Sequence, residues 1–196
     1  MSRTALLSVI CMMLFFNCVR KSNAPVQMKL DIHKLSPDSL YILVETGAGE
    51  VPAKIWDIQE QMLVADTAGR PWDFLPAIAN HGRLITGQNI TSWPVLLLTH
   101  RLPPGHIVAC KPIAVMSLDK DDRRWYYVIA LPSDTTLPAI RPVSYMDFMT
   151  RYDGVRHLLE NWMIHYQGLG AVQRVQWHAE LYLQELIDST DANFKE

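Results

Sequence analysis

The sequence lacks the motifs that identify several common classes of enzyme. It contains no His-Glu-x-x-His zinc motif, no Gly-x-Ser-x-Gly nucleophile elbow and no glycine-rich phosphate loop. It also lacks long runs of lysine and arginine, and its net charge is −2 at pH 7. These absences argue against a zinc protease, a serine hydrolase, a P-loop protein and a nucleic-acid-binding protein.

Length and composition predict one globular domain. The chain has 196 residues, of which 49% are hydrophobic, and this is enough to build a sizeable core. Its 12 prolines and 9 glycines are spread along the chain, which excludes a disordered or low-complexity protein.

The first 17 residues have the pattern of a signal peptide. Arg3 gives the N-terminal region a positive charge. Residues 5–16 are an apolar segment shorter than the roughly 20 residues of a membrane-spanning helix. Cys18 follows this segment directly, where a lipoprotein signal places its lipid-modified cysteine. The competing cleavage site after Ala24 is separated from the segment by two basic residues and is followed by proline. We therefore predict export and lipid attachment at Cys18.

The predicted mature protein has two parts. Residues 18–38 form a tether, and residues 39–190 form the domain, held at the cell envelope as a periplasmic or outer-membrane lipoprotein. Cys11 leaves with the signal peptide and Cys18 carries the lipid. Cys110 is then the only cysteine in the domain, so no internal disulfide is expected.

Residues 39–131 show the period of short β-strands. Apolar and polar side chains alternate over residues 40–45, as in a strand with one buried face. Residues 69–87 are irregular, and residues 118–123 are expected to form a turn. Strands are expected at residues 40–45, 51–57, 61–66, 95–99, 106–116 and 124–131. Short strands at intervals of about ten residues predict a closed or half-closed barrel.

The C-terminal third has a helical period. Apolar residues line one face of residues 155–166, and a second helix is expected around residues 179–187, after an extended piece at residues 172–177. The predicted fold class is therefore mainly β with α, a small closed β-barrel flanked by two main C-terminal helices. Trp162 and Met163 are expected between the barrel and the first helix.

The segment from Asn89 to Pro132 is a series of apolar strand-like stretches that contains few acidic residues. It reads NITSWPVLLLTHRLPPGHIVACKPIAVMSLDKDDRRWYYVIALP. It resembles the soluble inorganic pyrophosphatases, in which Asp-Gly-Asp-Pro-x-Asp-Val-Leu-Val-Leu-Thr is followed by Pro-Gly, an Arg-Pro-Ile/Val-Gly-Val strand, an acidic turn and Ala-Val-Pro. Residues 161–169, NWMIHYQGL, resemble the family's Phe-Phe-x-His-Tyr-Lys-x-Leu, and residues 172–177 resemble its Lys-Val-x-x-Trp. The resemblance covers about residues 39–188.

The resemblance implies a fold, a cofactor and a ligand. Members of the family have an OB-like barrel and hold divalent metals, usually magnesium, with carboxylates. The metals convert a bound water into a nucleophile, while lysines, an arginine and tyrosines bind the phosphates of diphosphate. The bacterial family forms symmetric homo-oligomers and works in the cytoplasm, whereas export is predicted for this chain.

The residues that hold metal in the family are mostly replaced here. Its Asp-Gly-Asp-Pro-x-Asp motif falls on residues 89–94, where Asn89, Thr91 and Pro94 stand in place of the three aspartates. Asn89 still offers a carbonyl oxygen as a ligand. The family's later carboxylates and lysine fall near Lys120, Trp125 and Tyr127, and its strand arginine falls near Thr67, with Arg70 as a substitute.

Some candidate site residues remain at matched positions. Glu45 is a candidate metal ligand, Lys54 and Tyr166 are candidate phosphate contacts, and a shifted loop offers Asp119, Asp121 and Asp122 as further metal ligands. Each also has a purely structural interpretation. Glu45 is then an ordinary strand residue and Lys54 a surface lysine. Tyr166 is then a core aromatic residue on a helix, and the three aspartates belong to a solvent-exposed turn.

Two functions follow from these observations. The first is an exported binding or structural module with the pyrophosphatase fold and little or no activity, whose ligand is diphosphate or phosphate and which binds magnesium or no metal. The second is an active inorganic diphosphatase, or a related phosphate-ester hydrolase, with a rebuilt metal site. The protein is expected to associate with the membrane through its lipid anchor. It is not expected to bind nucleic acid.

Overall fold

The computed structural model describes residues 35–36, 39–51, 54–57, 59–60, 62–65, 75–86, 89–166 and 171–193. The predicted signal peptide, Cys18 and most of the predicted tether lie outside these residues. None of the helices in the described part has both the length and the apolar character that a membrane span requires.

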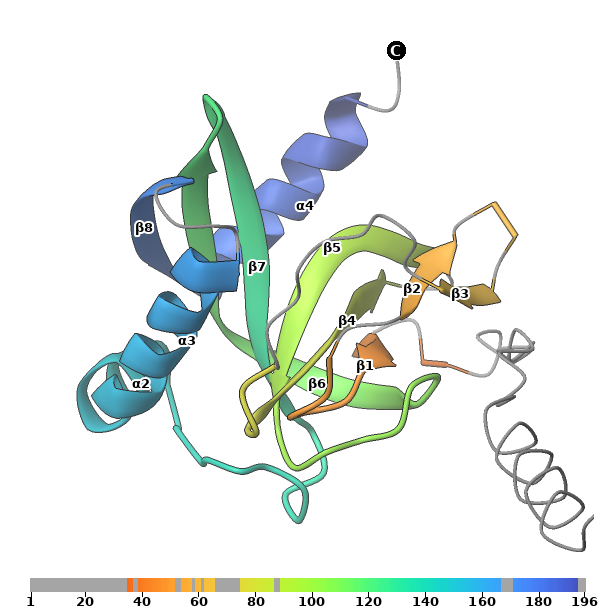
Figure 1. Cartoon of the computed structure of the whole chain (residues 1–196), viewed down its shortest axis with the longest axis horizontal. Helices are drawn as coiled ribbons and strands as arrows, with labels where there is room; N and C mark the ends of the chain where they lie inside the picture. Colours follow the sequence, from red (N-terminus) through yellow and green to blue (C-terminus); the bar gives the residue numbers. More distant parts are fainter. Residues whose placement is uncertain are drawn as a thin grey trace, which may run out of the picture.

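Short strands build the centre of the fold. The main sheet has six strands in the order β1 (Leu40–Thr46), β4 (Ala79–Thr86), β5 (Asn89–Leu98), β7 (Arg123–Pro132), β6 (Ile107–Lys120) and β8 (Val172–Ala179). Because β1 also pairs with β6, five of these strands close into a ring and β8 lies outside it. A hairpin of β2 (Lys54–Asp57) and β3 (Met62–Ala65) lies beside the ring (Figure 1). This closed ring agrees with the predicted OB-like architecture.

The long strand β6 belongs to both the ring and the outer part of the sheet. It has 14 residues; its first four pair with β1, whereas residues 114–120 pair with β8. Its pairing with β7 shifts in register between Pro112 and Ala114, close to the point where the strand leaves the ring. Proline has no N–H to donate, so Pro112 suits a position where the hydrogen bonding between the two strands is interrupted.

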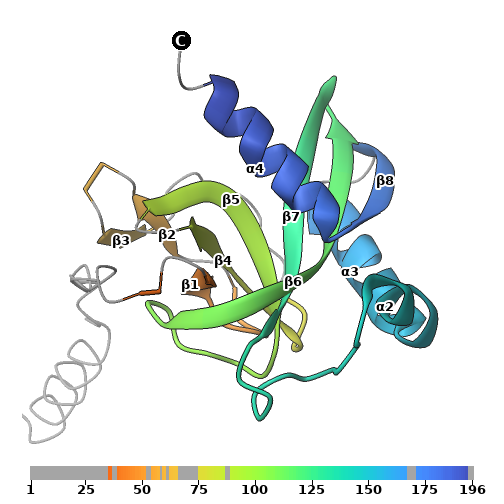
Figure 2. The ribbon, with the colours of Figure 1, turned by 180° about the vertical axis from the view of Figure 1, so that it is seen from behind.

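Helices cover both faces of the outer sheet. Figures 1 and 2 show α2 (Tyr145–Arg151) and α3 (Asp153–Tyr166) on one face and α4 (Leu181–Asn193) crossing the other. Met163 is fully buried in the core beneath α3, and Trp162 packs against the same core while partly buried. The predicted location of both side chains is therefore confirmed.

Alternating side chains of the central strands supply two separate cores. In β5, Leu96 and Leu98 face α2 and α3, whereas Val95 and Leu97 face the core that includes residues of α4. All four are fully buried, as expected for a strand covered on both sides. A third cluster, which includes Trp56, packs the β2–β3 hairpin against β1 and β4.

The structure corrects two expectations about regular elements. Residues 79–86 were expected to be irregular but form β4, and the expected turn at residues 118–123 is reduced to Asp121 and Asp122. The glycine in β4 obscured its strand pattern, yet Gly82 is required there. A Cβ at this position would lie 2.0 Å from the carbonyl oxygen of Leu43, so only glycine permits this approach of the strands.

The structure also contains a helix that the sequence pattern did not predict. α2 has only 7 residues, and it begins after Ser144, whose Oγ accepts a hydrogen bond from the N–H of Asp147. Phe148 is its one fully buried side chain. A helix this short shows too few turns for its apolar period to stand out.

Candidate functional site

The most unusual polar group of the described residues is the buried carboxylate of Glu45 on β1. Glu45 is 1% exposed, and its Oε1 accepts hydrogen bonds from the backbone N–H of Trp56 at 2.7 Å and from Nε of Arg83 at 3.0 Å. Its Oε2 lies 3.2 Å from Nδ1 of His81 but has no aligned hydrogen bond. Three elements, β1, β2 and β4, thus meet at one carboxylate.

The pairing of β1 with β4 explains how these side chains come together. His81 and Arg83 are two residues apart on β4 and therefore point to the same face. The register shifts on β1 between Val44, which pairs with Gly82, and Thr46, which pairs with His81. Glu45 is the extra residue at this bulge, and a bulge redirects the side chain that it contains.

The surroundings of Glu45 favour its ionised form. Burial raises the pKa of this carboxyl, but the close contact with His81, the charge of Arg83 and the N–H of Trp56 together outweigh burial and leave the pKa below its ordinary value. The negative charge is therefore already balanced by protein groups. We call Glu45, His81 and Arg83 the Glu45 cluster.

The β5 residues at the positions matched to metal-binding aspartates offer few free ligands. Asn89 is exposed at the start of β5. The hydroxyl of Thr91 donates to the carbonyl of Leu84 at 2.8 Å and accepts from the N–H of Trp93 at 3.2 Å. Pro94 has no polar side chain, and it pairs with Arg83 on β4.

The candidate aspartates of the β6–β7 hairpin do not point toward a common centre. Asp119 forms a double hydrogen bond with Arg124, at 2.6 Å to Nε and 3.1 Å to Nη2, which lowers the pKa of Asp119. Asp121 and Asp122 form the turn, with φ of 51° and 57°. The hairpin tip projects beyond the ring, away from β1 (Figures 1 and 2).

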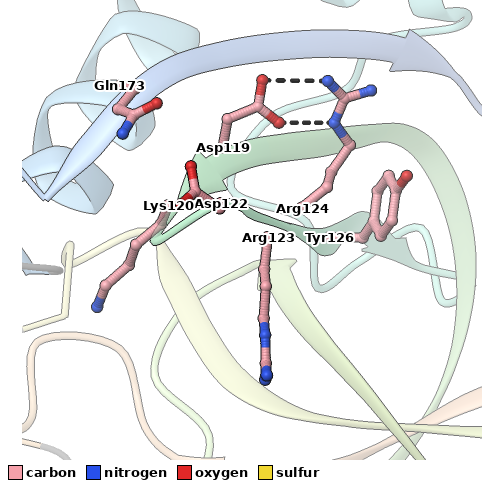
Figure 3. A pocket seen from close by; sticks show the side chains of 7 residues that line it. All are labelled: Asp119, Lys120, Asp122, Arg123, Arg124, Tyr126 and Gln173. Carbon is pink, nitrogen blue, oxygen red and sulfur yellow. Dashed lines mark hydrogen bonds and ion pairs between the residues drawn. The ribbon is translucent and has the colours of Figure 1, made fainter.

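An open depression of about 510 Å³ lies at this hairpin. It is lined by Asp119, Lys120, Asp122, Arg123, Arg124, Tyr126 and Gln173. Figure 3 shows Asp119 and Arg124 joined on one side of the hairpin, while Lys120 and Arg123 point to the other side. The depression therefore contains an internally satisfied ion pair rather than a set of converging carboxylates.

The remaining predicted residues are only partly placed by the structure. Lys54 begins β2, is partly buried, and shares a strand face with Trp56, whose N–H contacts Glu45. Tyr166 is the last residue of α3, and its side chain lies outside the described part, as do Thr67 and Arg70. The structure thus brings β2 to Glu45 and leaves the phosphate-contact role of Lys54 and Tyr166 as a prediction.

Ser117 and His178 form a pair that the sequence did not indicate. Oγ of Ser117 lies 2.9 Å from Nε2 of His178, and the imidazole stacks on Tyr182 with ring centroids 4.3 Å apart. Burial, with the charge of Arg124, lowers the pKa of His178. Because Ser117 is only 1% exposed, a substrate does not reach its hydroxyl, so the pair joins β6 to β8 structurally.

The closed five-strand ring, with a long shared strand and helices on both faces of the outer sheet, is the fold of the soluble inorganic pyrophosphatases. The chain is similar to an inorganic pyrophosphatase from Neisseria gonorrhoeae, with a TM-score of 0.62 and 18% identity, covering 84% of this chain and 99% of that one. It is also similar to one from Thermus thermophilus, with a TM-score of 0.62 and 16% identity over 81% and 93% of the two chains.

A third similar structure is an inorganic pyrophosphatase from Schistosoma japonicum, with a TM-score of 0.64 and 12% identity over 83% of this chain and 68% of that one. No protein-family description and no curated protein sequence matches the chain. The predicted resemblance is therefore confirmed for the fold. A shared fold does not establish an activity, which has to be argued from the site.

The donor set of the described residues does not fit a magnesium ion. Magnesium requires near-octahedral oxygen ligands, usually including one or two carboxylates. Among the residues that the structure describes, no three His, Cys, Asp or Glu side chains converge closely enough to hold a metal. The carboxylate of Glu45 is occupied by His81 and Arg83, and that of Asp119 by Arg124.

Proposed function

We propose that this protein is an exported, lipid-anchored binding module that has the pyrophosphatase fold and does not hydrolyse diphosphate efficiently. The observation that carries the proposal is the Glu45 cluster, in which the side chains of Arg83 and His81 occupy the one carboxylate that remains at a matched position. The predicted signal peptide and Cys18 support the location, and the shared fold supports diphosphate or phosphate as the class of ligand.

The replaced aspartates imply a large loss of rate. In two-metal hydrolysis, metals lower the pKa of the attacking water and stabilise the leaving oxygen, and each effect contributes several kcal/mol. Asn89, Thr91 and Pro94 supply no carboxylate for this purpose. At about 1.4 kcal/mol per decade of rate, we expect a deficit of more than three or four decades relative to an intact enzyme of the family.

Phosphate release from diphosphate tests this proposal. The full chain, purified in detergent, is assayed with and without magnesium, beside Glu45→Gln and Lys54→Ala variants and a conventional pyrophosphatase. We expect release at the background rate from all three forms of this protein. Turnover of tens per second that either substitution abolishes would establish an active diphosphatase with a rebuilt site and disprove the proposal.

A further inference from the structure

One face of the projecting β6–β7 hairpin combines basic side chains with an exposed tryptophan. Trp125 on β7 is 52% exposed, and Arg123, two residues before it, is exposed as well. Lys120 on β6 pairs directly opposite Arg123. Residues two apart on a strand, and residues directly opposite on neighbouring strands, point to the same side of a sheet. Lys120, Arg123 and Trp125 therefore share one side, which we call the hairpin face.

The acidic side chains of the hairpin do not neutralise this face. Figure 3 shows Lys120 and Arg123 pointing to one side of the hairpin, while Asp119 and Asp122 point to the other. Asp119 is already paired with an arginine on its own side. Asp121 lies at the exposed tip, beyond the face. The hairpin thus presents positive charge and an aromatic ring together on one side.

This combination suits the surface of a membrane with negatively charged lipids. The indole of tryptophan has an apolar body and one N–H, and it is favoured at the level of the lipid headgroups. Lysine and arginine are attracted to negatively charged headgroups. The family's later carboxylates fall near Lys120 and Trp125, so a basic and aromatic face stands where the family has acidic residues.

The predicted lipid anchor brings a membrane within reach of the hairpin. From Cys18 to Leu40 the chain has about 22 residues, which extend at most roughly 70–80 Å. A compact domain of about 150 residues has a radius of gyration of only about 15 Å. The connecting chain can therefore pass along the domain, and the projecting hairpin can meet the membrane that holds Cys18.

We propose that the hairpin face docks on the negatively charged surface of the membrane to which the chain is anchored. Trp125 lies at the level of the headgroups, and Lys120 and Arg123 contact their charges. The proposal goes beyond the binding function proposed above and takes only the membrane from the predicted anchor. Two basic residues and one ring do not hold a protein at a membrane alone, so the contact orients a domain that the lipid already retains.

Quenching of tryptophan fluorescence by brominated lipids tests this contact. The full chain, purified in detergent, is reconstituted into vesicles of phosphatidylcholine or phosphatidylglycerol whose acyl chains are brominated near the headgroup, and flotation verifies that it stays with them. We expect quenching with phosphatidylglycerol at low salt, little with phosphatidylcholine, and a loss of quenching in 1 M salt, where the Debye length is about 3 Å.

Matched substitutions locate the contact. Trp125→Phe keeps an apolar ring and should remove the quenching, whereas Trp93→Phe, at a partly buried tryptophan of β5, should retain it. Lys120→Gln and Arg123→Gln should each lower the ratio of docked to undocked protein about fivefold, equivalent to about 1 kcal/mol per basic residue. Arg151→Gln on α2, where the arginine side chain is 72% exposed, is the charge-matched control and should behave as wild type.

The variants are compared after circular dichroism shows a native spectrum. Equal quenching with both lipids, or quenching that persists in Trp125→Phe, would overturn the proposal, because the contact would then be independent of charge or made elsewhere. Flotation without quenching would remove the hairpin contact and leave the anchor, whereas protein that floats with neither vesicle would remove both. The hydrolysis assay has no bearing on these outcomes.

Discussion

At the scale of single residues, Glu45 shows how a protein can keep a buried carboxylate ionised with its own groups. An unpaired buried charge costs several kcal/mol, so its partners must supply both charge and hydrogen bonds. Arg83 provides the charge, Nδ1 of His81 lies 3.2 Å from the second carboxylate oxygen, and the N–H of Trp56 adds a bond from a different element. These interactions make Glu45 a connection between β1, β2 and β4 as well as a site residue.

The first residue-scale prediction concerns pH. Because the pKa of Glu45 is lowered from the ordinary value of 4.5, its charge stabilises the folded state above about pH 4.5, and this contribution is lost as pH falls through the lowered pKa. Glu45→Gln should reduce the free energy of unfolding by about 2–4 kcal/mol at pH 7. It should also make the free energy of unfolding fall less steeply as the pH drops below about 4.5. Urea unfolding across the acid range measures both effects. Glu60→Gln, at an exposed position, should retain the wild-type curve; parallel curves for Glu45→Gln and wild type would contradict the prediction.

The second residue-scale prediction concerns Asn80, which is fully buried at the start of β4. Its Oδ1 accepts from the N–H groups of Ala48 and Leu102, both at 2.9 Å, and its Nδ2 donates to the carbonyl of His100 at 3.1 Å. Asn80→Ala leaves these groups without partners and should cost about 3 kcal/mol or more. Chemical denaturation measures the loss, with exposed Asn89→Ala as the matched control. A loss below about 1 kcal/mol would show that water replaces the amide.

At the scale of elements, the strands found from sequence are those with a continuous apolar pattern. β7 was expected at residues 124–131 and spans Arg123–Pro132. β6 was expected to end near residue 116 but continues to Lys120, because Ser117 and Leu118 stay buried between β7 and β8 while the polar Asp119 and Lys120 end the apolar pattern. β4 was missed because it carries polar side chains and a glycine, and with it the partners of Glu45.

The β6–β7 hairpin gives an element-scale prediction. Asp121 and Asp122 both have positive φ, as the two central residues of a type I′ turn do, and glycine adopts this conformation most easily. Asp122→Gly should therefore raise the free energy of unfolding by up to about 1 kcal/mol, because relief of about 1–2 kcal/mol of left-handed strain exceeds the added chain entropy of about 0.5–1 kcal/mol, while Asp122→Val should lower it. Equilibrium unfolding of the pair measures the difference. A more stable valine variant would show that this turn conformation is not adopted.

At the scale of the whole molecule, the apolar frame and the candidate site depend on different residues. Val95 and Leu97 of β5 are fully buried, and such packing largely determines the fold, so the frame was recognisable from sequence. Asn89, Thr91 and Pro94 of the same strand contribute little to that packing and can change while the fold persists. Sequence analysis found Glu45 but not its partners His81 and Arg83, because their meeting depends on a bulge and on cross-strand register, which composition and spacing do not reveal.

The predicted lipid anchor sets the last prediction, which concerns the molecule as a whole. From Cys18 to Leu40 the chain has about 22 residues, which extend at most roughly 70–80 Å, so the domain can reach well above a membrane surface. Because Cys18 precedes residue 39, where the predicted domain begins, Cys18→Ala should abolish incorporation of a fatty-acid analogue and move the protein from the membrane to the soluble fraction. Its thermal midpoint in detergent should stay unchanged. Equal labelling of wild type and Cys18→Ala, or a mature N-terminus at Pro25, would show that ordinary signal cleavage releases the protein.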